Sequence, residues 1–243
     1  MNSGSSTDLN QLDLSNAFDT LDHVRLATKA AQAGLRGALL FWLSRLLVGR
    51  SERVLYCGSC SRSYCFLSVV HECSVPRPTL FNLYPYDMPH SKDVLLVQYA
   101  EDTSILACVL PSVHSLALLH DHLTRVSRWA TANHLSISTT KSVLLRLHNS
   151  KRAASPIYTL GDSVLPAVSS ASILGVQFTP PLDFSLHISN IEAKARRTLG
   201  FGLRTSKPCG PETFCTLYTA LELPRLEYCS SVWNIYQLYP PTG

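Results

Sequence analysis

Residues 97–104, Val97-Gln98-Tyr99-Ala100-Glu101-Asp102-Thr103-Ser104, form the most informative stretch of this sequence. Apolar residues precede it at 94–96 and follow it at 105–110. This pattern predicts two strands joined by a tight turn that carries two carboxylates. Neighbouring carboxylates repel each other. Their placement therefore indicates either a divalent metal bound through carboxylate oxygens or a charged, solvent-exposed hairpin tip.

A second acidic stretch, LDLSNAFD at residues 12–19, favours the metal interpretation. It predicts a short strand that ends near Asp13, because the polar residues 6–11 stand where an apolar run would extend the strand. A helix is expected to begin near residues 19–22, where acidic side chains suit the helix dipole, and to end at Gly34.

Composition limits the class of protein. A hydrophobic content of 46% and a charged content of 16% predict a folded chain of one or two domains. The net charge of +4 permits a nucleic-acid partner without requiring one. No signal peptide and no apolar run of about 20 residues is visible, so we expect an intracellular protein of the nucleus or cytoplasm, neither secreted nor transmembrane.

The eight cysteines are expected to be reduced and partly buried. Cys57 and Cys60 have the spacing of one half of a zinc site, but no second pair completes it, so no zinc is expected.

Hydrophobic spacing predicts the remaining elements. A helix after Gly34 should bury the stripe Leu35, Leu39, Trp42 and Leu46. We further expect a strand pair at 50–67 that turns at Gly58-Ser59, a helix at 115–133, a strand at 143–147 and short strands at 157–160 and 173–178. Two helices complete the prediction, one at 187–204 with a buried stripe of Ile188, Ile191, Ala195 and Leu199, and one at 212–223 that ends at Pro224.

Several motifs, in this order and spacing, resemble the reverse transcriptase domain of non-LTR (LINE-type, jockey/CR1-like) retrotransposons. They are residues 12–23, residues 70–89, the YAEDT sequence at 99–103, and the later matches Trp129, Asn133, Leu135, Lys141, Leu174-Gly175-Val176, Phe184, His187-Ile188, Leu199-Gly200, Leu217-Tyr218, Pro224, Leu226-Glu227-Tyr228 and Val232-Trp233.

The resemblance implies an α+β fold, namely the palm of a right-hand polymerase with an antiparallel sheet backed by helices. The palm would span residues 1–148, connecting strands 149–180, and a helical thumb-like part 181–243, with the fingers missing. It also implies an RNA template, a DNA primer and nucleotidyl transfer assisted by two Mg²⁺ or Mn²⁺ ions.

The same resemblance assigns roles to residues. Asp13, Glu101 and Asp102 would be catalytic metal ligands, and Lys141 a proton donor. The nucleotide would contact Phe18, Glu72 and Tyr99, and nucleic-acid phosphates would contact Lys194, Arg196, Arg197 and Arg204.

The sequence departs from the family pattern at functional positions. Glu101 stands where the family has the first Asp of YADDT, Glu72 replaces a Gln, and Cys73 and Arg77 replace glycines. These changes and the missing fingers predict a reverse transcriptase remnant that no longer synthesises DNA. Two alternatives stay open at this point: an active polymerase completed by another chain, or a nucleic-acid-binding or interaction module without catalysis.

Overall fold

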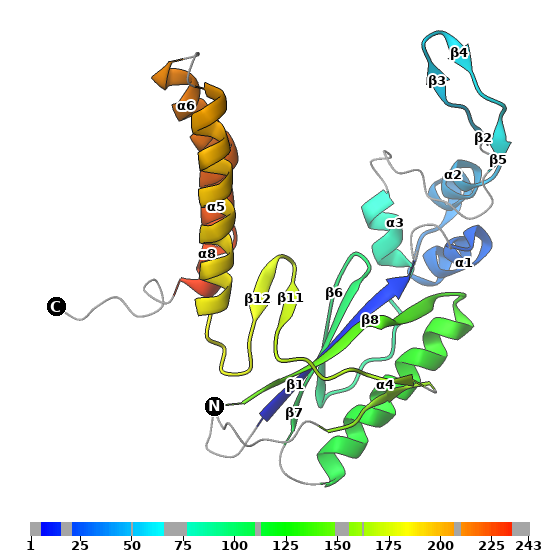
Figure 1. The fold of residues 1–243 in the computed structure, drawn as a ribbon. Coiled ribbons are helices and arrows are strands. Elements are labelled where there is room, and N and C mark those ends of the chain that lie inside the picture. Colours follow the sequence, from blue (N-terminus) through cyan, green and yellow to red (C-terminus); the bar gives the residue numbers. More distant parts are fainter. Residues whose placement is uncertain are drawn as a thin grey trace. The chain divides into compact units, whose positions relative to one another are not determined.

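A computed structural model describes residues 6–15, 21–49, 51–65, 77–109, 113–148, 156–161, 163–206 and 210–234. The chain forms two compact units, residues 1–168 and residues 169–243. The fold is α+β, as predicted, and its main sheet is antiparallel (Figure 1).

Four strands form the sheet of the first unit: β1 (Ser6–Ser15), β6 (Val94–Tyr99), β7 (Asp102–Val109) and β8 (Ser136–Leu147). Their order is β6-β7-β1-β8, and every neighbouring pair is antiparallel. The predicted hairpin is confirmed, because β6 and β7 pair from Val94 opposite Ala107 to Tyr99 opposite Asp102. Strand β1 lies between β7 and β8 and is therefore central.

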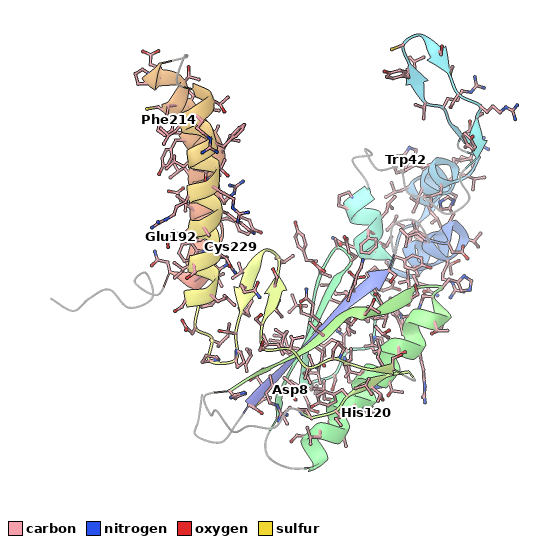
Figure 2. The ribbon with its side chains drawn as sticks, viewed as in Figure 1. Asp8, Trp42, His120, Glu192, Phe214 and Cys229 are labelled. Carbon is pink, nitrogen blue, oxygen red and sulfur yellow. The ribbon has the colours of Figure 1, made fainter. Side chains whose placement is uncertain are left out.

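The prediction of a shortened strand before Asp13 was wrong, because β1 continues through the polar residues back to Ser6. The sequence pattern did not predict that Asp8, which Figure 2 labels, is buried. Its carboxylate accepts two hydrogen bonds from Arg146, at 2.7 and 2.9 Å, and one from the Tyr158 hydroxyl at 2.7 Å. A buried charge that is matched in this way is tolerated inside a sheet.

Helix α4 (Val113–Ala132) covers one face of this sheet (Figure 1). The predicted helix is present, and its apolar residues at helical spacing form one stripe: Leu119, Leu123, Val126 and Ala130 are buried, and Leu116 is partly buried. The first three pack in one apolar cluster with Leu12 of β1. Since successive side chains of a strand point to opposite faces, Leu12 and Leu14 direct Asp13 to the face that α4 does not cover.

A second apolar cluster joins helices α1 (His23–Gln32), α2 (Gly37–Leu47) and α3 (Arg77–Leu83) to the end of β1. Helix α1 begins as predicted near residue 22, where the Asp22 carboxylate accepts hydrogen bonds from two backbone amides of the first turn. The predicted core stripe around α2 was wrong in part, because Leu35 and Leu46 pack against this cluster as expected but the other two members do not. Leu39 and Trp42 are more than half exposed, and Leu43 and Leu47 are buried instead, so the buried face is rotated by one residue.

The region 51–65 forms two short strand pairs, β2 (Ser51–Glu52) with β5 (Tyr64–Cys65) and β3 (Leu55–Tyr56) with β4 (Ser59–Cys60). The inner turn lies at Cys57-Gly58, one residue earlier than predicted, and both residues have positive φ as a type I′ turn requires. This hairpin extends away from the rest of its unit (Figure 1). Cys57 and Cys60 are consequently exposed, not partly buried as expected, and Cys108 and Cys215 are exposed too.

Residues 156–168 complete the first unit with the short pair β9 (Thr159–Leu160) and β10 (Ser163–Val164). The second unit begins with the hairpin β11 (Ala171–Ile173) and β12 (Val176–Phe178). Tyr228 fixes its turn, because the hydroxyl donates to the Leu174 carbonyl at 2.9 Å and the ring lies against Gly175.

The rest of the second unit is helical: α5 (Ser185–Ser206), α6 (Pro211–Leu217), the π-helical turn η2 (Tyr218–Glu222), α7 (Leu223–Glu227) and α8 (Ser230–Trp233). Both predicted helices are present. The α5 stripe is only partly buried, however, and Ile188 is exposed. Pro224 does not end the second helix. Instead, Pro224 lies in the first turn of α7, where its missing N–H costs little.

Candidate functional site

The two acidic stretches of the sequence meet in the sheet. Asp13 of β1 lies directly opposite Asp102 of β7 in the antiparallel register. Directly opposite residues project from the same face, with Cβ atoms about 4.5–5.5 Å apart. Asp13 and the Glu101-Asp102 turn therefore lie side by side on neighbouring strands.

The turn between β6 and β7 contains only Ala100 and Glu101. Ala100 has a φ of 50°, a left-handed conformation that residues with a Cβ rarely adopt. A positive φ at the first loop residue is typical of the II′ hairpin turn. The amide of Leu14 donates to the Glu101 carbonyl at 3.4 Å. The backbone that carries Glu101 is therefore held against β1, at the end where Asp13 lies.

Like charges define the electrostatics of this site. Burial raises the pKa of the Asp102 carboxyl above its ordinary value, and the negative charges of Glu101 and Asp13 raise it further. A cation between these groups would remove the repulsion.

Among the described residues, Lys141 provides the cation beside Asp13, with its Nζ 3.9 Å from Asp13 Oδ1. A bulge in β8 accounts for this position. Gln11 pairs with Val143, but Asp13 pairs with Ser138, so residues 139–142 have no partners on β1. The buried Ser142 hydroxyl accepts from the Asp13 amide at 3.2 Å and donates to the Ser138 carbonyl at 2.6 Å, which satisfies both groups.

Sequence reasoning missed Ser142, because nothing in the spacing of β8 marks a bulge there. The remaining predicted residues of the acidic site are placed in part. Tyr99 lies opposite Asp102 on β6, with its side chain 67% exposed. Phe18, Glu72 and Cys73 lie outside the described residues. Among the side chains that the structure describes, no three of the His, Cys, Asp or Glu type are arranged to hold a metal ion.

Two motif residues, Trp129 of α4 and Asn133 directly after it, make contacts that stabilise packing and do not belong to the acidic site. Trp129 donates its ring N–H to Asp87 Oδ1 at 3.1 Å, and the Lys29 ammonium lies 2.5 Å from the same oxygen and 5.0 Å from the Trp129 ring. The Tyr84 hydroxyl donates to the Asn133 carbonyl at 2.8 Å. These contacts join α1, the segment that follows α3, and α4 through a buried lysine.

The predicted nucleic-acid-binding residues all lie on α5 of the second unit and are all exposed: Lys194, Arg196, Arg197 and Arg204. Arg196 is paired with Glu192 one turn earlier, at 2.5 Å. Arg197 and Arg204 are seven residues apart and so project from one side of the helix. No helix in the described ranges is both long and apolar enough to cross a membrane.

Comparison with known proteins identifies relatives over most of the chain. The chain is 25% identical over 233 residues to the probable RNA-directed DNA polymerase from transposon X-element of Drosophila melanogaster. It is 26% identical over 236 residues to the RNA-directed DNA polymerase from mobile element jockey of Drosophila funebris. Each match covers 92% of this chain, which spans only 25% of the length of each relative.

Among solved structures, the chain is similar to apo telomerase from Candida tropicalis, at 9% identity and a TM-score of 0.47 over 74% of this chain and 35% of that one. The model of the family described as reverse transcriptase (RNA-dependent DNA polymerase) matches residues 1–178. This match covers well over half of the 243 residues and includes both acidic strands. The chain therefore belongs to the reverse transcriptase family and is a reverse transcriptase domain of the kind found in non-LTR retrotransposons.

Proposed function

We propose that this chain forms the palm of an RNA-directed DNA polymerase in which Asp13 and Asp102 bind divalent metal ions, and that Glu101 weakens this site enough to suppress DNA synthesis. The observation that carries the proposal is the direct pairing of Asp13 with Asp102 beside a tight hairpin turn.

The donor set suits Mg²⁺ or Mn²⁺. Carboxylate oxygens are the hard ligands that these ions prefer, and Mg²⁺ usually takes one or two carboxylates together with water and substrate phosphates. A pair of aspartates is therefore sufficient, and a closed cage of three protein ligands is not required. The pKa of Asp102 is raised first by burial and then by the charges of Glu101 and Asp13, and a bound cation would offset the second of these effects.

When bound, the metal ions would supply activation of the primer 3′ hydroxyl and neutralisation of the triphosphate charge. The chain's own residues would position the reactants. Lys141, 3.9 Å from Asp13, would hold a proton beside the acidic pair and provide it to the departing pyrophosphate. Tyr99 would contact the nucleotide from β6, and Phe18 and Glu72 would complete that contact.

Glu101 is the reason to expect impaired synthesis. Its backbone is held by Leu14 of β1, so the additional methylene of Glu, compared with Asp, must displace the carboxylate itself. A misplacement of roughly 1 Å can cost on the order of a hundredfold in rate where catalysis depends on positioning.

The second unit would serve as the thumb-like part. Exposed basic residues of α5 would contact phosphates of an RNA template and a DNA primer without reading sequence. With such substrates, we expect the protein to act inside the cell, in the nucleus or the cytoplasm.

The direct test is Mn²⁺ binding to the purified chain, measured by calorimetry. We expect Asp13→Asn and Asp102→Asn each to weaken binding by about tenfold or more, since each removes a charged ligand. Glu101→Asp should tighten binding and increase nucleotide incorporation on a primed RNA template. Asp93→Asn, at an exposed acid before β6, is the matched control. Equal Mn²⁺ affinity of the wild type and the Asp13→Asn/Asp102→Asn double variant would contradict the proposal.

The exposed basic residues of α5 support a second candidate function, nucleic-acid binding without catalysis. Replacing Lys194, Arg196, Arg197 and Arg204 with Ala should then weaken RNA–DNA duplex binding and flatten its salt dependence. The acidic-site variants distinguish the two functions, because they should change Mn²⁺ affinity and leave duplex binding in EDTA unchanged. An unaltered salt dependence in the four-Ala variant would show that this surface is only solvated.

A further inference from the structure

The bulge at residues 139–142 of strand β8 lies next to the acidic pair, since Ser138, directly before the bulge, pairs with Asp13 of β1. Figure 1 shows β8 beside β1. Bulges often redirect a side chain next to a functional site. This bulge brings Lys141 to Asp13, with the lysine Nζ 3.9 Å from Asp13 Oδ1.

Ser138 holds the bulge through three hydrogen bonds. Its hydroxyl accepts from the Lys141 amide at 3.3 Å and is hydrogen-bonded to the Thr140 hydroxyl at 3.1 Å. Its carbonyl accepts from the Ser142 hydroxyl at 2.6 Å. These contacts fix the backbone of Lys141, whereas the Lys141 side chain is 70% exposed and therefore has room to move.

The charges around Asp13 explain why an ammonium group lies there. Asp13 is opposite Asp102 and beside Glu101, and these like charges repel one another. Lys141 offsets part of this repulsion. The contact is long and largely exposed to solvent, and ion pairs of this kind are weak. Another cation that reaches the Asp13 carboxylate can therefore displace Lys141.

We propose that Lys141 is a tethered counter-ion that competes with divalent ions for Asp13, and that Ser138 is the positioning residue that holds it there. This inference rests on the proposed function, because both concern the same carboxylates. Two cations at one carboxylate repel each other, so Lys141 must leave Asp13 when an ion binds. Lys141 would then become available to the pyrophosphate only after it has left Asp13.

The test is a calorimetric titration of Mn²⁺ into the full chain and its variants at about 0.15 M salt. Lys141→Gln removes the competing charge, so Mn²⁺ should bind about two- to fivefold more tightly, the range that corresponds to a weak exposed ion pair. Lys141→Arg keeps the charge, and its Mn²⁺ affinity should stay within about twofold of the wild type.

Lys92→Gln is the matched control, because it removes the same charge from an exposed lysine of the same unit. Lys92 precedes β6, and this strand extends for about 17 Å between Val94 and Tyr99, at the level of Asp102. That distance exceeds the Debye length of about 8 Å, so the Mn²⁺ affinity of Lys92→Gln should change by less than about 1.5-fold. The comparison separates competition at Asp13 from a general change in charge.

A double-mutant cycle examines Ser138. Ser138→Ala releases Lys141, so Mn²⁺ should bind more tightly, by less than in Lys141→Gln. In the Lys141→Gln background the same substitution should have no effect, because no ammonium group remains to be held. Ser138→Thr retains the hydroxyl and should retain the wild-type affinity. Equal effects of Ser138→Ala in both backgrounds would show that Ser138 acts on Asp13 directly, which overturns its positioning role.

Circular dichroism of each variant verifies that it is folded. Tighter Mn²⁺ binding in Lys141→Gln and unchanged binding in Lys92→Gln would support the counter-ion. If Asp13→Asn weakens Mn²⁺ binding but Lys141→Gln does not tighten it, the counter-ion inference is wrong and the proposed metal site stands. If Asp13→Asn does not weaken binding, the proposed function fails and this inference fails with it.

Discussion

Two aspartates lie five residues apart on strand β1 and have opposite surroundings. Asp8 is fully buried, and its carboxylate accepts three hydrogen bonds from Arg146 and Tyr158. Asp13 is 25% exposed, lies opposite another aspartate, and among the described residues has the exposed Lys141 as its ion-pair partner, at 3.9 Å. The same strand therefore holds one carboxylate whose charge is balanced and one whose charge is not.

The pKa shifts around these two residues express the difference. Burial and the hydrogen bond to Asp8 raise the pKa of the Tyr158 hydroxyl, which therefore remains a protonated donor. The hydrogen bond to Asp8 likewise raises the pKa of Arg146. Opposite Asp13, on β7, the group with a raised pKa is a carboxyl, that of Asp102. A balanced charge stabilises the sheet, whereas an unbalanced one keeps capacity for an external cation.

The largest expected effect is that of Asp8→Ala. Removing this carboxylate deprives the Arg146 guanidinium, which is 12% exposed, of its two charge-assisted hydrogen bonds to Asp8. We expect the free energy of unfolding to fall by about 3–5 kcal/mol. Urea denaturation should detect this loss, and amide hydrogen exchange should locate it in β1 and β8.

Asp13→Ala is the matched control on the same strand. Its exposed ion pair with Lys141 contributes little, so the free energy of unfolding should change by less than about 1 kcal/mol. If the two variants lose similar stability, the distinction between a structural and a functional aspartate fails.

A smaller effect is expected for Ser142→Ala, which removes the hydroxyl that bridges Asp13 and Ser138. The Asp13 amide and the Ser138 carbonyl each lose a hydrogen bond, so stability should fall by about 1–1.5 kcal/mol. Because the same hydroxyl fixes the bulge that carries Lys141, Mn²⁺ affinity at the acidic pair should change as well. Ser142→Thr, which retains a hydroxyl, should restore both properties. A stability loss with unchanged Mn²⁺ affinity would show that the bulge is independent of the site.

Much of the fold follows from local pattern. The hairpin at 94–109 and helix α4 could be predicted because alternating and helical apolar spacings are strong signals there. The length of β1 could not, because the buried Asp8 near its start is accommodated by Arg146 and Tyr158, which are 138 and 150 residues away from it. The predicted buried face of α2 differs from the observed one by one residue. Nearly all side chains of this helix are apolar, so their spacing does not define one face.

The parts of the candidate site that lie in the family motifs could be predicted from the sequence. Asp13, Asp102 and Lys141 come together as the family resemblance implied, although their roles stay a proposal. Two features had no sequence signal. The Ser142 bridge depends on a bulge that only the strand register reveals, and the π-helical turn η2 precedes Pro224, where the sequence indicated only a helix end.

The smallest and most specific effect is expected for Asp102→Asn. The pKa of Asp102 is raised above 3.8 in the folded protein, so the folded state binds the proton more strongly than the unfolded state does. Stability is therefore lost as the pH rises from 3.8 through the folded-state pKa, and above it the ionised carboxylate opposes folding. Asparagine has no charge to repel Glu101 and Asp13.

The variant should consequently be more stable than the wild type at about pH 7, by about 0.2–1 kcal/mol, the range for like charges directly opposite in a sheet. Thermal melts should show a rise in Tm of up to about 4 °C, which shrinks as the pH approaches 3.8, where the wild-type carboxyl becomes protonated. Adding Mn²⁺ should stabilise the wild type and leave the stability of Asp102→Asn nearly unchanged, because the variant lacks the Asp102 carboxylate that would bind the ion. A variant that is less stable than the wild type at pH 7, or a difference that does not vary with pH, would assign Asp102 to the balanced class that Asp8 represents.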